Sequence, residues 1–106
     1  MRSYTIDVFI LAKDGSGDVV HDERIVMRAE NLDGMRRQFI KDYSKYRTRI
    51  NAYWFRRVKG RVTGDHIVIN PDGTAEYLDH NLVWWNIDPR TGRLKSRIPA
   101  PRRRYE

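Results

Sequence analysis

The sequence predicts an α+β fold: a single domain of order β-β-α-β followed by a β-meander of short hairpins, with one helix packed on a mainly antiparallel sheet. Three observations favour this fold. The apolar period changes from about 2 to about 3.6 near residue 31 and returns to about 2 near residue 48. Two later segments repeat a strand, turn, strand plan. The 106 residues are 40% hydrophobic and include no cysteine, which suits one small core without disulfide bonds.

The first two strands are predicted to form a hairpin. Residues 3–12 are rich in β-branched and aromatic side chains, and residues 19–29 return as the second strand. Between them, residues 13–18 contain two glycines, which favour a reversal of the chain. Because both faces of residues 3–12 carry apolar side chains, we expect this strand to be central in the sheet.

A helix is predicted over residues 31–46. Asn31 or Asp33 can cap its first turn, because either side chain accepts a hydrogen bond from a free backbone N–H group. Apolar residues recur there at steps of three and four: Leu32, Met35, Phe39, Tyr43, Tyr46 and Ile50. This spacing places them on one face of the helix, which we expect to pack on the sheet.

Residues 49–63 are predicted to form the longest strand, which Gly60 and Gly64 bend or end. Its apolar side carries Ile50, Ala52, Trp54, Val58 and Val62. Residues 67–78 and 83–98 follow as hairpins that turn at 70–73 and 88–92, where proline and glycine favour turns. Residues 1–101 are therefore predicted to be one domain, and 102–106 a flexible basic tail.

Positive charge is concentrated in two segments of the chain. The net charge is +7 and the isoelectric point is near 10.1. Residues 35–63 hold ten basic residues and one acidic residue, and residues 90–106 hold seven basic residues and one acidic residue. Blocks of this kind are typical of proteins that bind polyanions, although lysine and arginine also keep small proteins soluble.

The basic segments supply three candidate surfaces for RNA or single-stranded DNA. The second side of strand 49–63 alternates cations with rings: Arg49, Tyr53, Phe55, Arg57, Lys59 and Arg61. Cations neutralise phosphates and rings stack on unpaired bases. The helix supplies a second row, Arg37, Lys41 and Lys45, and the tail a third, Arg102, Arg103 and Arg104. Alternatively, Tyr53 and Phe55 pack under the helix or the meander, and the helix cations form an ordinary solvated face.

Trp84 and Trp85 indicate a second class of function. Neighbours in a strand point to opposite faces, so we expect one indole in the core. The other is either covered or exposed as an anchor for a partner. The alternative function is therefore a protein-interaction module that binds an acidic protein surface or self-associates. The expected oligomeric state is a monomer or a weak homodimer. Binding to an anionic membrane is less favoured, because no amphipathic helix with bulky exposed apolar residues is seen.

No catalytic, metal or cofactor site is predicted, and the protein is not expected to be an enzyme. His21, His66 and His80 lack the spacing of metal ligands. The pairs Asp65-His66 and Asp79-His80 repeat with the hairpins, and we interpret these imidazoles as ordinary strand residues. Gly15-Ser-Gly17 precedes a strand rather than a helix, so it is not a phosphate-binding loop. Without a long apolar segment or a visible signal peptide, the expected location is the cytoplasm, with no membrane contact.

Two short segments resemble parts of the small ββαβ ribosomal proteins of the archaeal large subunit. They are Ala29-Glu-Asn31 before the helix, and Ser44-Lys-Tyr-Arg47 with Arg49-Ile50 after it. The resemblance involves about a third of the chain, and the tryptophan-rich meander has no counterpart there, so we transfer no residue's role from that family.

Overall fold

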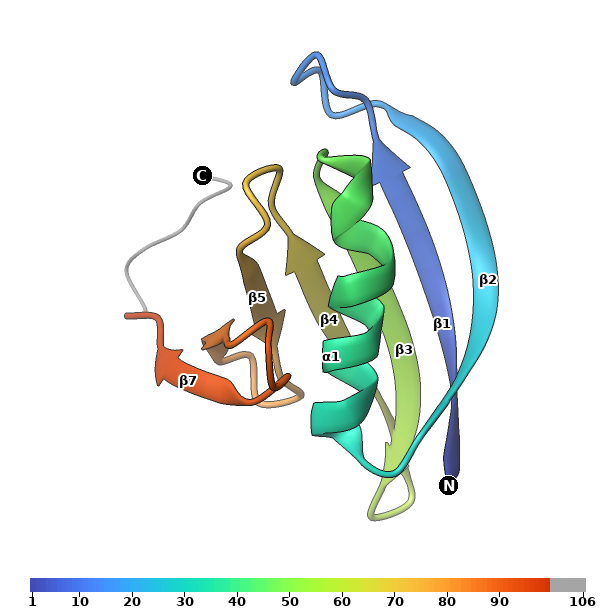
Figure 1. Ribbon diagram of the computed structural model, residues 1–106. Coiled ribbons are helices and arrows are strands. Elements are labelled where there is room, and N and C mark those ends of the chain that lie inside the picture. The colour runs from blue at the N-terminus through green and yellow to red at the C-terminus, as the bar shows by residue number, and fades with distance from the viewer. Residues whose placement is uncertain (100–106) are drawn as a thin grey trace.

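The computed structural model describes residues 1–99, with the backbone alone for residues 56–58 and 61–63. The predictions for Arg102, Arg103 and Arg104 lie outside the described residues, as do those for the side chains of Arg57 and Arg61. Within this range, seven antiparallel strands form one open sheet with a single α-helix packed on it (Figure 1). The predicted α+β architecture is therefore confirmed.

The strands lie in the order β2-β1-β3-β4-β5-β6-β7. Their bounds are β1 (Arg2–Leu11), β2 (Val19–Ala29), β3 (Ile50–Val58), β4 (Arg61–Ile69), β5 (Ala75–Leu78), β6 (Trp84–Ile87) and β7 (Leu94–Arg97). Consecutive strands pair as hairpins except at one point, where the helix carries the chain from β2 to β3. Because β3 pairs with β1 over residues 7–10, β1 has a neighbour on each side, as predicted.

The prediction of one strand over residues 49–63 is wrong, because the chain reverses within it. β3 ends at Val58, β4 begins at Arg61, and these two residues pair. The turn residues Lys59 and Gly60 have φ of 49° and 78°, as a two-residue hairpin turn requires. Lysine is uncommon at positive φ, so the sequence carries little sign of this turn. Lys59 consequently lies at the tip of a hairpin, and Arg61 begins the next strand.

The helix forms close to its predicted bounds, as α1 (Leu32–Tyr43) followed by a 3-10 turn, η1 (Ser44–Tyr46). The Asn31 side chain accepts a hydrogen bond from the Gly34 N–H at 2.9 Å, so Asn31 is the N-cap. The predicted apolar stripe ends at Tyr43, since Tyr46 is exposed where the helix tightens into η1.

The core lies between α1 and one face of the sheet. Alternate residues of the strands point into it, among them Ile6, Val8, Ile10, Ile50, Ala52, Trp54, Ile67 and Ile69. They meet the buried residues of α1: Met35, Phe39, Ile40 and Tyr43. The other face carries no helix in the described part of the chain (Figure 1). We call it the uncovered face.

The β6–β7 turn packs directly on the first turn of α1. Arg36 is only 4% exposed, and its Nε donates a hydrogen bond of 2.7 Å to the carbonyl of Gly92. Its Nη2 donates to Asp33 Oδ1 at 2.5 Å, and its guanidinium lies 4.8 Å from the centroid of the Tyr77 ring. A Cβ on Gly92 would lie 1.9 Å from the Asp33 carbonyl oxygen. The C-terminal hairpin is therefore held against the helix by backbone contact and one buried cation.

Candidate nucleic-acid interface

Four rings stand in a row on the uncovered face: Phe9, Tyr53, His66 and Trp84. The register brings them together, because Tyr53 pairs with His66, and Leu78 joins His66 to Trp84 across β5. Phe9 lies on β1, two residues after Asp7, which is opposite Tyr53. We call these four side chains the aromatic row.

The rings of the aromatic row contact one another. The Phe9 and Tyr53 centroids are 5.8 Å apart at an interplanar angle of 72°, and Tyr53 stacks on His66 at 4.3 Å and 15°. His66 meets Trp84 edge-on, at 5.7 Å and 63°. Edge-to-face and stacked pairs are the favoured arrangements of aromatic side chains, so the row is held in a defined geometry.

Tyr53 and Phe55 both present ring surface to solvent. Tyr53 is 37% exposed and Phe55 is 65% exposed. One edge of the Phe55 ring lies against the opposite strand, where a Cβ on Gly64 would be 3.1 Å from Phe55 Cε1. The structure thus places both rings on the uncovered face and not under the helix or the meander.

The aromatic row carries no charge at neutral pH. Burial lowers the pKa of His66 to about 4, and it raises the pKa of Tyr53 above its ordinary value. The neutral imidazole has Nε2 3.2 Å from Asn51 Oδ1, which fixes the ring beside Tyr53. Near one edge, Arg24 Nε donates to Asp7 Oδ1 at 2.6 Å, so this acid is neutralised by a partner on β2.

Three cations gather where β3 begins. Lys13, Arg47 and Arg49 line a cavity of about 440 Å³ together with the glycines of the β1–β2 loop, and the described residues that line it include no acidic side chain. Backbone contacts fix this corner, because Leu11 N–H donates to the Arg49 carbonyl at 3.0 Å and Thr48 Oγ1 donates to the Leu11 carbonyl at 2.7 Å. We call Lys13, Arg47 and Arg49 the basic end.

The structure separates the other predicted cations from the rings. Arg37 and Lys41 are exposed on α1, and Lys45 is exposed in η1. All three belong to the helix layer, on the opposite side of the sheet from the aromatic row (Figure 1). Lys59 is exposed at the tip of the β3–β4 hairpin.

The two tryptophans take different positions. Trp84 belongs to the aromatic row and is partly buried. Trp85 packs against the core, and its Nε1 donates to Asp79 Oδ2 at 3.0 Å. Their opposite orientation agrees with the prediction, and neither indole stands fully exposed as a partner anchor would.

Sequence reasoning missed Phe9, His66 and Lys13 as members of this surface. The signal for His66 was the turn at Lys59-Gly60, because residues equally far from a hairpin turn pair with each other. Once that turn is placed, Tyr53 must lie opposite His66. Lys13 joins Arg49 only through the pairing of β1 with β3, which no local pattern indicates.

In the range that the structure describes, no group of three or more His, Asp or Glu side chains is placed to hold a metal ion, and no helix is long and apolar enough to cross a membrane. Comparison with known proteins gives no match: no family model fits the sequence, and neither a curated protein nor a solved structure is significantly similar to it.

Proposed function

We propose that this protein binds single-stranded nucleic acid, RNA or single-stranded DNA, on the uncovered face of its sheet and without catalysis. One observation carries the proposal: Tyr53, in the neutral aromatic row, and the neighbouring Phe55 are both exposed on the uncovered face of the sheet. Several single-strand-binding modules use this arrangement, because rings on a sheet stack on unpaired bases of any sequence.

The two exposed rings have different shares in the proposed binding. Phe55 offers the larger free surface, while part of Tyr53 is already covered by His66. A base stacked on an aromatic side chain contributes about 1–3 kcal/mol. We therefore expect Phe55 to contribute more affinity than Tyr53.

The basic end supplies the proposed phosphate contacts. Arg49 precedes β3 on the same side as Tyr53 and Phe55, so cation and rings follow one strand. An acidic side chain, Asp22, stands opposite Phe9 on β2. Since this acid repels phosphates, the nucleic acid is expected to run along β3, from Arg49 toward Phe55, and not toward β2.

The test is a fluorescence anisotropy titration with labelled single-stranded RNA, single-stranded DNA and duplex DNA of equal length. Single strands are expected to bind more tightly than the duplex, whose bases are not free to stack. Phe55→Ala should weaken single-strand binding about tenfold. The matched control is Val26→Ala, which removes an equally exposed apolar side chain from β2, 67% exposed.

The salt dependence separates rings from cations. Replacing Lys13, Arg47 and Arg49 with alanine should reduce the slope of log K against log salt by about 2, at about 0.7 per phosphate contact. Phe55→Ala should leave that slope unchanged. Absence of binding at low salt, or equal binding of duplex and single strand, would show that the proposal is wrong.

A further inference from the structure

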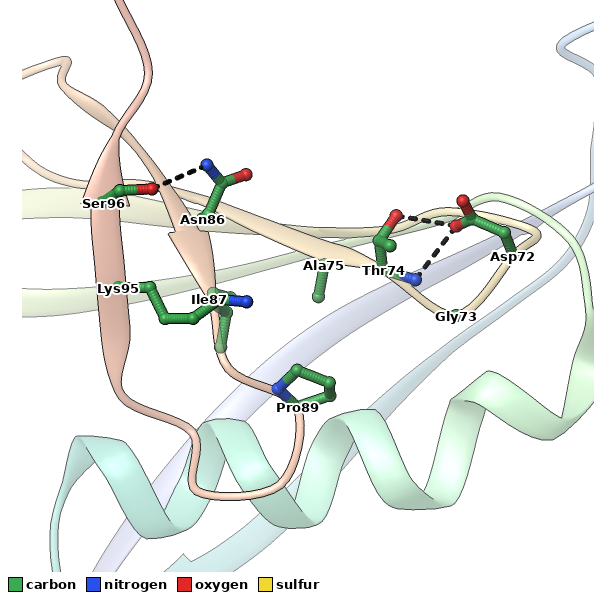
Figure 2. A pocket seen from close by; sticks show the side chains of 9 residues that line it. All are labelled: Asp72, Gly73, Thr74, Ala75, Asn86, Ile87, Pro89, Lys95 and Ser96. Atoms are coloured by element: carbon green, nitrogen blue, oxygen red, sulfur yellow. Dashed lines mark hydrogen bonds between the residues drawn. The ribbon is translucent and has the colours of Figure 1, made fainter.

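A groove lies between α1 and the C-terminal hairpins. One part, of about 570 Å³, is lined by Arg37 and Lys41 of α1 and by Arg90 of the β6–β7 turn. A second part, of about 550 Å³, is lined by Lys95 and by polar side chains of the β4–β5 turn, β6 and β7 (Figure 2). Gly73 and Pro89 line both parts, so the two parts adjoin. We call the whole the helix groove.

The helix groove is strongly cationic. Arg37, Lys41, Arg90 and Lys95 are exposed, and no ion pair among the described residues involves any of them. Among the described residues that line the groove, Asp72 is the one carboxylate, and it already accepts hydrogen bonds from the Thr74 N–H at 3.0 Å and Oγ1 at 2.7 Å (Figure 2). Four cations therefore face one acid that is held in its own turn, which favours an anionic partner.

The rest of the lining combines polar side chains, such as Gln38 and Ser44, with aliphatic ones. Ile40, Ala75 and Ile87 are buried beneath the groove, and Pro89 is exposed at its centre. In Figure 2, the Lys95 side chain extends across the groove toward Ile87. The described residues of the lining include no aromatic ring on which a base could stack. Pro89, exposed between the cations, suits a peptide that alternates carboxylates with apolar side chains.

The walls of the helix groove are held in place before any partner arrives. Arg36 bonds the Gly92 carbonyl, and the Gly92 backbone contacts that of Asp33, so the β6–β7 turn and α1 keep a fixed separation. Binding to a preformed groove avoids the entropy loss of ordering a loop.

We propose that the helix groove binds an extended acidic peptide segment of a partner protein. Its carboxylates would pair with Arg37, Lys41 and Arg90, and its apolar side chains would lie on Pro89. The peptide and the nucleic acid would then occupy opposite sides of one sheet, and the protein would connect the two partners.

The test uses a fluorescein-labelled synthetic peptide of alternating glutamate and leucine. Arg37→Ala combined with Arg90→Ala should weaken its binding about tenfold, as two charge contacts are lost. The control is Arg2→Ala combined with Arg28→Ala, which removes the same charge from exposed positions on β1 and β2 and should change affinity less than about twofold. Thermal unfolding of both variants should match the unsubstituted protein, because all four side chains are exposed.

Competition distinguishes this inference from the proposed function. Oligo-dT should not displace the peptide, and Phe55→Ala should leave peptide affinity unchanged. Equal peptide affinity of both double variants, or displacement of the peptide by oligo-dT, would overturn the inference. The proposed function is judged separately, by the oligonucleotide affinity of Phe55→Ala.

Discussion

The two faces of this sheet are built from alternate residues of the same strands, yet the side chains on one face are packed in the core and some on the other are exposed to solvent. The covered face is mostly apolar, and it buries the ring of Tyr77, whose Oη donates to Asp65 Oδ2 at 2.5 Å. On the uncovered face, Tyr53 and Phe55 keep ring surface in water. Removing a covered side chain should therefore affect stability, whereas removing a ring from the uncovered face should affect binding.

The sharpest contrast lies between two neighbours on β3. Trp54 is 2% exposed and Phe55 is 65% exposed. Trp54→Ala should lower the free energy of unfolding by about 3–5 kcal/mol, because it leaves a large cavity in the core. Phe55→Ala should lower it by less than about 1 kcal/mol. Urea denaturation checks both values, and a comparable loss from the two variants would contradict the assignment of faces.

A second comparison concerns two glycines with nearly the same φ. Gly92 (φ 77°) packs against the α1 backbone, while Gly15 (φ 79°) has nothing within 4 Å of an added Cβ. Gly92→Ala must move the β6–β7 turn off the helix and should cost about 3 kcal/mol. Gly15→Ala meets only the backbone strain, about 1 kcal/mol. Equal losses in thermal or urea unfolding would show that the turn does not depend on this contact.

The smallest expected effect is a pH dependence from the aromatic row. The pKa of His66 is about 4 in the folded protein against an ordinary value of 6.5. Between these values the unfolded chain binds a proton that the folded protein does not, so stability falls as the pH decreases from 6.5 toward 4. Above pH 6.5 the imidazole is neutral in both the folded and the unfolded protein, so His66 no longer lowers the free energy of unfolding.

His66→Phe keeps a ring in the aromatic row and removes the imidazole that binds the proton. The free energy of unfolding of this variant should therefore change less between pH 6.5 and pH 4. Asp7 and Glu23 also have lowered pKa values, but they act in the more acidic range, near and below their ordinary values of 3.8 and 4.5. Urea unfolding at several pH values between 7 and 5 isolates the imidazole. If the free energy of unfolding changes equally with pH in the unsubstituted protein and in His66→Phe, the burial of His66 is contradicted.

The elements that local chemistry determines were predictable from the sequence. The Asn31 cap, the stripe from Met35 to Tyr43 and the turns ending at Gly73 and Gly92 all carry local signals. The Lys59-Gly60 turn carried little local signal, because lysine rarely occupies positive φ. Without this turn, β3 and β4 were predicted as one strand.

The candidate site was predictable only in part. The alternation along β3 correctly put Tyr53 and Phe55 on the side opposite Trp54. Whether that side was covered depended on where the helix crosses the sheet, which the pattern left open. Arg36 reads as one more cation beside Arg37, and its burial comes from Gly92, 56 residues later in the chain. Long-range contacts of this kind leave no periodic signal.

The contact between the β6–β7 turn and α1 also has a consequence for synthesis on the ribosome. The chain emerges from its N-terminus, so α1 is complete long before Gly92 is translated. Until then Arg36 lacks the carbonyl that accepts its hydrogen bond, and the ring of Tyr77 that it later covers has not been made for most of that time. The first turn of α1 therefore gains its packing contacts only when the β6–β7 turn has been made. A nascent chain that stalls before residue 92 leaves the core beside this turn of α1 open to solvent.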